Sequence, residues 1–177
     1  MLGLQLFSYM IEHLSRISRI IRKSSGHGLL VSLGGNGRAT LSKMAAFLNG
    51  CDLFKAEFSR AYGRVEWLDD MKTLFKHAGI DDKPHVFNLT TKEAGNCPGA
   101  IEDVCSITNS GEVPNLFSQD DFEEIRAEVG KQARAATNLD LLALFHKRCR
   151  ANLHVLLSIS PAGDDLREHL RRYPALG

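Results

Sequence analysis

Apolar residues recur at every third or fourth position in several stretches of the chain, which is the spacing of an amphipathic helix. In the first stretch Met10, Leu14, Ile17 and Ile21 share one face, and the helix is expected to end at residues 24–26, which read Ser-Ser-Gly. Another helix is predicted to begin after Ser118, an N-cap residue followed by acidic side chains that suit the positive end of a helix. Further helices are predicted over Thr40–Asn49, Val65–Ala78, a short segment ending at Asn109, Asn138–Ala151 and Asp164–Arg172.

Short apolar runs alternate with these helices and are typical of strands. They lie at Leu29–Leu33, Asp52–Phe58, His85–Thr90 and Leu153–Ile159. Strands that alternate with helices imply a parallel sheet with helices on both faces, so the predicted fold class is a three-layer α/β domain. A further strand would be expected after residues 173–174, where the chain stops.

Composition limits the classes of protein to which the chain can belong. Its 177 residues, 44% of them hydrophobic, are enough for one domain. A net charge of +1 gives no electrostatic argument for a nucleic acid or a membrane as partner. No apolar run approaches the roughly 20 residues of a membrane span, the opening segment lacks the marks of a signal peptide, and the four cysteines show no C-x-x-C spacing. These features favour an intracellular, cytoplasmic protein.

The strongest chemical signal is a glycine-rich stretch that follows the first apolar run. Such a loop before a helix can turn its backbone N–H groups toward a phosphate. Compared with the pattern G-x-x-x-x-G-K-[ST], Ser32 replaces the first glycine, Arg38 the lysine and Ala39 the hydroxyl that binds Mg²⁺. Thr40, one residue later, is the remaining candidate for that hydroxyl. The alternative interpretation is a glycine turn without a ligand. The candidate phosphate-binding residues are Gly34, Gly35, Asn36, Gly37, Arg38, Ala39 and Thr40.

A nucleotide-hydrolysing site also needs acidic side chains at the end of a downstream strand, to hold Mg²⁺ and to polarise water. The strand His85–Thr90 is the candidate, but Thr91 and Lys92 follow it and the first acid is Glu93. Because side chains alternate between faces along an extended strand, this one-residue offset is expected to aim Glu93 away from the loop. We therefore expect Glu93 to be a surface residue, and it is the sole, weak candidate for catalysis.

Three other stretches resemble one family. They are residues 12–20 (EHLSRISRI), 109–117 (NSGEVPNLF) and 152–164 (NLHVLLSISPAGD), and in this order they resemble the fourth AAA+ module of a dynein heavy chain. The resemblance is closer to axonemal than to cytoplasmic members and runs from roughly Leu6 to Leu176. Residues 41–47, 59–63 and 171–174 fit the same register.

The resemblance implies the large α/β subdomain of an AAA+ P-loop NTPase, with a leading helix over residues 1–26 and a core over residues 27–177 that stops before the fifth strand and the helical lid. It implies ATP or ADP, with Mg²⁺, as ligands of the glycine loop. It also places Thr91 and Lys92 at the acid-pair positions, where relatives usually carry a carboxylate around position 92. Ser160 would lie near a polar sensor, and Arg171 or Arg172 would contact the nucleotide of a neighbouring module.

In the parent motor six such modules form a ring that converts ATP turnover into movement along microtubules. The resemblance therefore implies neighbouring AAA+ modules as partners, microtubules only through the parent motor, and a place in the cytoskeleton of a cilium or flagellum. Three hypotheses remain open for this chain: a regulatory ATP-binding module with little hydrolysis, a nucleotide-free structural segment of the ring, and an active ATPase that would depend on Glu93.

Overall fold

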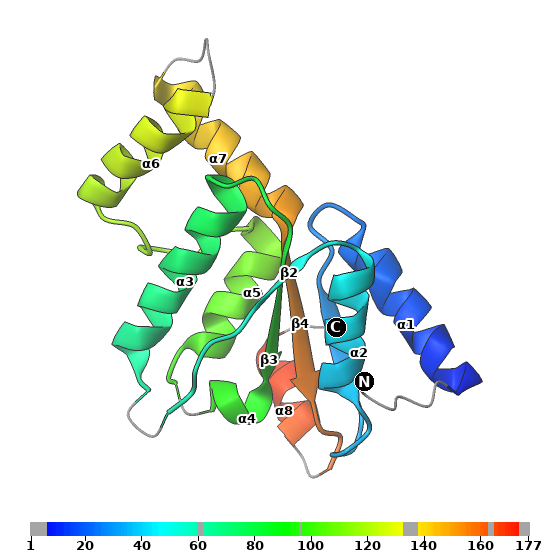
Figure 1. Ribbon diagram of the computed structural model, residues 1–177. Coiled ribbons are helices and arrows are strands. Elements are labelled where there is room, and N and C mark those ends of the chain that lie inside the picture. Colours follow the sequence, from blue (N-terminus) through cyan, green and yellow to red (C-terminus); the bar gives the residue numbers. More distant parts are fainter. Residues whose placement is uncertain (1–6, 60–61, 96, 133–137, 163–164, 174–177) are drawn as a thin grey trace.

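Four parallel strands form one sheet in the spatial order β1-β4-β3-β2 (Figure 1). The computed structural model describes residues 7–59, 62–95, 97–132, 138–162 and 165–173. The central strands β3 and β4 match the predicted ranges, and β4 is buried along its whole length. Such continuous burial is expected for strands covered on both faces. The strands are β1 (Gly28–Val31), β2 (Asp52–Phe54), β3 (His85–Thr90) and β4 (Leu153–Ile159).

The helices agree with the predicted ones to within two or three residues at most ends. The exception is a four-residue helix, α4, which is not among the predicted elements. The helices are α1 (Ser8–Ile21), α2 (Arg38–Leu48), α3 (Arg64–Gly79), α4 (Thr91–Ala94), α5 (Ala100–Ser110), α6 (Gln119–Gln132), α7 (Asn138–Asn152) and α8 (Asp165–Arg172).

The second strand is shorter than predicted, because the expected range Asp52–Phe58 contains a strand only as far as Phe54. Beyond this residue the chain leaves the sheet, and the Phe58 ring packs on Tyr62 at a centroid distance of 4.6 Å. Phe54, Ala56 and Phe58 still bury one side against the main core. The alternation of apolar and polar residues beyond Phe54 therefore comes from burial of one side of the segment, not from pairing with a neighbouring strand. The first strand also differs, since it covers Gly28–Val31 rather than Leu29–Leu33 and lies at the sheet edge with Val31 45% exposed.

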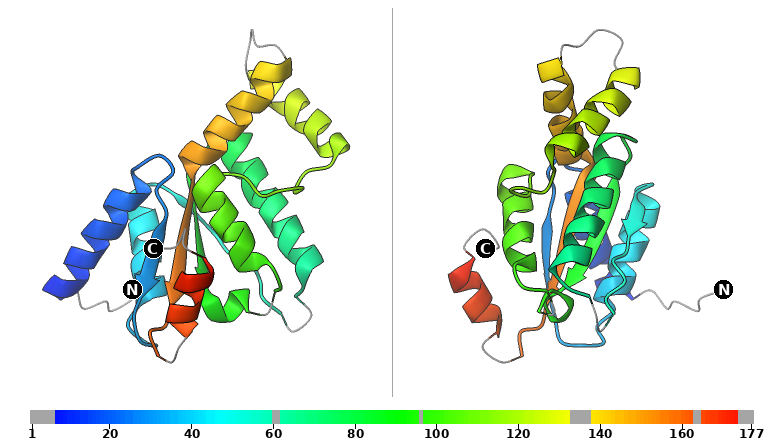
Figure 2. Two further views of the ribbon diagram at one scale, coloured as in Figure 1. Left: turned by 180° about the vertical axis from the view of Figure 1, so that it is seen from behind. Right: turned by 90° about the vertical axis from the view of Figure 1, so that its left-hand side faces the viewer.

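Helices cover both faces of the sheet and make the predicted three layers (Figure 2). On one face, α1 and α2 pack together over Val86 and Leu156. On the other, Phe87 and Leu157 pack against α3, α5, α6 and α7. The neighbours 86 and 87 thus face opposite layers, as the alternation of a strand requires. The inward residues of α3 are buried, namely Trp67, Met71, Leu74 and Phe75.

An ion pair between the exposed Arg64 and the buried Asp103 joins the start of α3 to the start of α5. Asp103 is 6% exposed, and both its oxygens accept hydrogen bonds from the Arg64 guanidinium. The same carboxylate accepts the indole N–H of the fully buried Trp67 at 2.7 Å. The network satisfies the buried carboxylate and the polar atom of the largest core side chain together. Removing the carboxylate would leave the buried indole N–H without an acceptor, whereas the Arg64 side chain is 41% exposed and can donate to water.

We expect Asp103→Ala to lower the free energy of unfolding by about 2–3 kcal/mol, because Trp67 and Arg64 lose their shared acceptor. Urea unfolding followed by tryptophan fluorescence measures the effect. Asp69→Ala removes an exposed carboxylate from the same helix and should change stability by less than about 0.5 kcal/mol. Equal stability of the two variants would contradict this role of Asp103.

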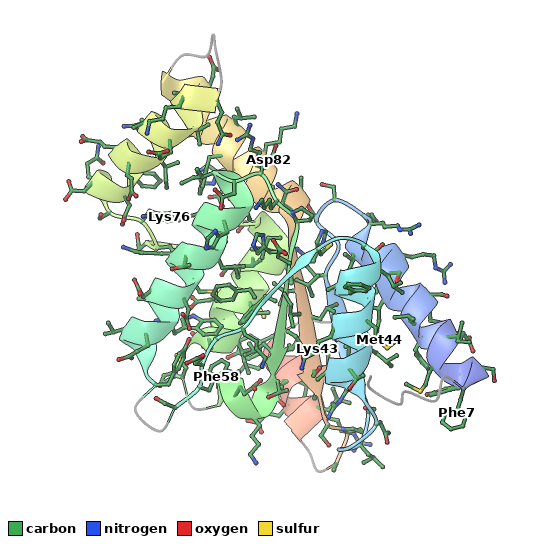
Figure 3. All side chains as sticks on the ribbon, in the orientation of Figure 1. Phe7, Lys43, Met44, Phe58, Lys76 and Asp82 are labelled. Carbon is green, nitrogen blue, oxygen red and sulfur yellow. The ribbon has the colours of Figure 1, made fainter. Side chains whose placement is uncertain are left out.

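Ser118 caps α6, as the sequence predicts. Its hydroxyl accepts the Asp121 N–H at 3.3 Å, and the Asp121 carboxylate accepts the Ser118 N–H at 2.8 Å. The Nζ atoms of Lys72 and Lys76 in α3 donate hydrogen bonds to Asp121 and Glu124 of α6, each at 2.6 Å. Lys76 is labelled on α3 in Figure 3. Hydrogen bonds from Lys72 and from the Ser118 backbone lower the pKa of Asp121 to about 2. Polar contacts therefore hold α6 on α3 above the apolar core.

Two histidines extend the pairing of β1 with β4 beyond the backbone ladder. The Val155 N–H donates to Nδ1 of His27 at 3.1 Å, and Nδ1 of His154 contacts the carbonyl oxygen of Gly26 at 2.9 Å. An N–H group can only donate and a carbonyl can only accept, so Nδ1 is unprotonated in His27 and carries the proton in His154. Burial, and then the charge of neighbouring His154, lower the pKa of His27 to about 4, and burial lowers that of His154.

Acid should therefore weaken the fold. The ordinary pKa of histidine is 6.5, so below pH 6.5 this side chain binds a proton in the unfolded chain. In the folded chain His27 does not bind that proton until the pH falls to about 4. The contribution of neutral His27 to the free energy of unfolding is present above pH 6.5. It is lost as the pH falls toward 4, by up to about 3 kcal/mol. His154 acts in the same direction.

Denaturant unfolding at a series of pH values between 4 and 8 tests this expectation. His27→Asn is the matched variant, since its amide oxygen can accept the Val155 N–H but does not titrate. The variant should lose less stability than the wild-type chain over this interval. Parallel curves for the two proteins would show that His27 does not cause the acid sensitivity.

Candidate functional site

The predicted site residues gather at the carboxyl ends of the parallel strands. The loop between β1 and α2, the short helix α4 after β3, and α8 after β4 all lie at the lower edge of the sheet in Figure 1. In open α/β sheets, ligands bind outside this edge. The fold thus places residues 32–40 and the end of the strand His85–Thr90 at the same edge of the sheet, with β4 between them.

The glycine loop has the backbone that a phosphate-binding loop needs. Gly35 and Gly37 have φ values of +86° and +72°, in the left-handed region that favours glycine. No atom lies within 4 Å of a Cβ built on Gly34, Gly35 or Gly37, so the space beside the loop is open. Gly37 is the N-cap of α2, whose first N–H groups face this space with the positive end of the helix dipole.

Arg38 links the loop to the end of β4. Its Nη1 donates a hydrogen bond to the carbonyl oxygen of Ile159, the last residue of that strand. The guanidinium has five N–H donors, so the contact with Ile159 leaves others for an anion. The Arg38 backbone is held in turn, because the buried Ser42 hydroxyl donates to its carbonyl oxygen at 2.9 Å.

The residues that follow Arg38 offer little to a metal ion. Ala39 is exposed and has no oxygen in its side chain. Thr40 is half-buried in the first turn of α2, and no hydrogen bond of its hydroxyl is recorded within the described ranges. A helix turns about 100° per residue, so Thr40 does not project where a hydroxyl at position 39 would.

We expected Glu93 to point away from the loop because side chains alternate along an extended strand. That reason was wrong, since the strand ends at Thr90 and a helical turn follows. The Glu93 carboxylate instead turns back on Thr90. Its Oε2 accepts the Thr90 N–H at 2.8 Å and the Thr90 hydroxyl at 2.7 Å, while the Glu93 N–H donates to that hydroxyl at 3.2 Å. This is a capping box at the start of α4, and one oxygen of the carboxylate is committed to it. Thr91 is half-buried and Lys92 is exposed.

A polar pair inside the sheet was not anticipated from the sequence. Asn88 of β3 and Ser158 of β4 interact across the ladder, with 3.4 Å between Ser158 Oγ and Asn88 Oδ1. They lie on the face that carries Val86 and Leu156, below α2 and the loop. The signal was present, because both interrupt otherwise apolar runs. Ser160 follows β4, is half-buried, and accepts the Ala162 N–H at 3.4 Å.

The two candidate inter-module arginines lie on α8, on the α5 side of the sheet (Figure 2). Arg172 Nη2 lies 3.3 Å from Glu102 Oε1 of α5, and the Tyr173 hydroxyl donates to the same oxygen at 3.1 Å. Arg172 thus helps to hold α8 on α5. Arg171 is exposed, and within the described ranges no ion pair is recorded for it.

The stretch that carried the most specific resemblance, residues 109–117, lies outside this site. Gly111 ends α5 with a φ of +75°, and a Cβ there would lie 2.4 Å from Cγ of Arg150 in α7. The Arg150 carbonyl oxygen accepts the Ser25 N–H at 2.8 Å, which joins the end of α1 to the end of α7. Gly111 is required by close packing rather than by chemistry.

Comparison with known proteins decides the family. Residues 2–177 match the family described as P-loop containing dynein motor region D4. The chain belongs to this family. Dynein axonemal heavy chain 2 of Mus musculus is 38% identical over 177 residues, and dynein axonemal heavy chain 1 of Homo sapiens is 35% identical over 179 residues. The Dynein-1-beta heavy chain, flagellar inner arm I1 complex, of Chlamydomonas reinhardtii is 38% identical over 179 residues.

These alignments cover 98–99% of the dynein region described here but 4% of the length of each relative. The resemblance seen in the sequence and the α/β P-loop fold are therefore confirmed. No helix within the described ranges is long and apolar enough to cross a bilayer.

We expect Glu93→Ala to lower the free energy of unfolding by about 1 kcal/mol, because α4 loses half of its capping box. Glu93→Gln should retain most of the cap, since glutamine also serves at this position. Neither variant should change phosphate release from ATP. If Glu93→Gln abolished phosphate release while keeping wild-type stability, Glu93 would be a catalytic residue.

Proposed function

We propose that this dynein region binds ATP or ADP through the loop Ser32–Thr40 and serves as a regulatory module with little hydrolysis of its own. The observation that carries the proposal is the pair of left-handed glycines, Gly35 and Gly37, which lead directly into α2 and Arg38. Left-handed glycines give the loop a backbone that can turn its N–H groups toward an anion. Arg38 adds a fixed positive charge beside them.

Weak hydrolysis follows from the end of β3. In-line attack of water on a γ-phosphate needs a side chain that orients the water and a metal ion that neutralises charge. Thr91 and Lys92 have no carboxylate that could orient water, and the Glu93 carboxylate caps α4. Within the described segment that follows β3, no side chain is then free to act as the acid pair.

The surroundings of the module follow from its relatives, whose names are those of axonemal and flagellar dyneins. We propose that the region acts as part of a dynein heavy chain in the cytoskeleton of a cilium or flagellum. Its direct partners would be neighbouring AAA+ modules, and microtubules would be reached only through the whole motor. Arg171 is better suited than Arg172 to contact a neighbouring nucleotide, because Glu102 already engages Arg172.

The second candidate function is that of a structural ring segment without nucleotide. The departures at Ser32, Ala39 and Lys92 favour it, since each removes a standard contact of a P-loop. Nucleotide that co-purifies with the chain in near-equal molar amount would argue against this alternative. An active ATPase is the third candidate, and it would need Glu93 to leave its cap.

Isothermal titration of the chain with ATP and with ADP tests the proposed function. We expect saturable binding, and Arg38→Ala should weaken it by about tenfold or more, since a charge-assisted contact with phosphate is lost. Arg38→Lys should keep much of the affinity, because the positive charge remains.

Arg19→Ala removes an exposed arginine from α1 and is the matched control, which should bind as the wild-type chain does. Circular dichroism must show that every variant is folded. No saturable binding by the folded wild-type chain would reject the proposal in favour of the structural alternative.

A further inference from the structure

We infer that Arg38 couples nucleotide on the glycine loop to the end of β4, because its guanidinium can bind a phosphate and the carbonyl oxygen of Ile159 at the same time. The inference rests on the proposed function and deepens it. It names the side chain through which an occupied loop regulates the segment that follows β4. Arg38 is then a positioning residue as well as a ligand of the phosphate.

Both ends of the glycine loop contact one atom of β4. The Ile159 carbonyl oxygen accepts a hydrogen bond from the Ser32 N–H at 3.2 Å and another from Nη1 of Arg38. Ser32 directly follows β1, and Arg38 is the first residue of α2. The loop is therefore closed onto the last residue of β4, and Ile159 is fully buried.

The Arg38 contact is additional to the ladder of the sheet. A carbonyl oxygen has two lone pairs, and the Ser32 N–H already satisfies the oxygen of Ile159. Weakening the Arg38 contact therefore leaves no buried acceptor without a donor, and the strands remain paired. A regulatory contact needs this property, because its strength must change while the domain stays folded.

The arginine at position 38, where the standard P-loop pattern has lysine, allows this double contact. A guanidinium carries its five N–H groups in a planar fork, so one nitrogen can hold a carbonyl oxygen while another binds a phosphate. A lysine has a single nitrogen, which would have to lie within hydrogen-bond distance of both acceptors. The departure from the pattern therefore has a use that a lysine does not provide.

A bound phosphate should strengthen the hold of Arg38 on Ile159. Charge-assisted hydrogen bonds to a phosphate are stronger than neutral ones, so they would keep the guanidinium in one position. Once the side chain is held, it loses little further rotamer freedom by staying on the Ile159 oxygen. The peptide unit that contains this carbonyl also contains the Ser160 N–H, so the motion of Ser160 should be restricted as well.

The segment after Ile159 is the part of the chain that this effect would reach. Pairing with β1 ends at Ile159, and beyond it the Ala162 N–H donates to the Ser160 hydroxyl oxygen at 3.4 Å, a contact within the segment itself. The next element, α8, is joined to α5 by the ion pair of Arg172 with Glu102. Both side chains are more than half exposed, so this pair contributes little stability. Nucleotide on the loop would therefore order the connection to α8.

Amide hydrogen exchange measured by NMR on the whole 177-residue chain, with and without saturating ATP, tests the inference. In the wild-type chain we expect ATP to slow the exchange of the Ser160 and Ala162 amides by about threefold or more, the effect of strengthening one hydrogen bond. Arg38→Lys should still bind ATP, because the positive charge remains, but should lose this slowing. The ATP concentration is raised until each protein is saturated.

Arg38→Lys should fold, since the Ile159 oxygen keeps its hydrogen bond from Ser32. Lys43→Gln is the matched control, because Lys43 is an exposed cation on the same helix, α2, and is labelled in Figure 3. This variant should preserve both the binding of ATP and the slower exchange. The wild-type comparison with and without ATP needs no variant, so it decides the question even where a variant fails to fold.

Wild-type binding of ATP that leaves the exchange of Ser160 and Ala162 unchanged would overturn the inference and leave the proposed function intact. Equal slowing in Arg38→Lys would also overturn it, because the guanidinium would then not be needed for the coupling. Absence of saturable binding by the folded wild-type chain would instead reject the proposed function itself.

Discussion

The parallel pairing of β3 with β4 is the constraint on which the rest of the structure depends. These strands pair over six positions, from His85 with Leu153 to Thr90 with Ser158, and both are covered on both faces. Parallel neighbours cannot be joined by a tight turn, so each connection must cross one face of the sheet. The crossovers supply the two helical layers, and all four strands end at the same edge.

This edge of the sheet carries both the glycine loop and the charged side chains of the candidate site. β1 ends in the glycine loop, β3 ends in the cap of α4, and β4 ends at the carbonyl oxygen that accepts a hydrogen bond from Arg38. The Arg38 contact ties the loop to the central strand pair. The position of the loop therefore depends on the same ladder that organises the core.

At the end of β3, within the described residues, a lysine is accessible while the carboxylate next to it is engaged. Lys92 is exposed, whereas the Glu93 carboxylate is turned back onto Thr90. Our proposal of nucleotide binding with little hydrolysis rests on this difference. Membership of the dynein motor region D4 family is consistent with a site that holds nucleotide as part of a larger assembly.

The sequence alone determined the class of fold. Burial of one side of a helix or strand gives its apolar residues a characteristic spacing, and that spacing can be read from the local sequence. The sequence also placed β3, β4 and the helices other than α4 within a few residues, identified the glycine loop, and carried the family resemblance. Only the tertiary structure decided that Asp52–Phe58 leaves the sheet at Phe54, that Glu93 caps α4, that Asn88 meets Ser158, and that His27 accepts the Val155 N–H. Each of these depends on a partner supplied by the folded chain, such as a ring, a capped turn or a neighbouring strand, and a pattern of apolar and polar residues does not encode where that partner will lie.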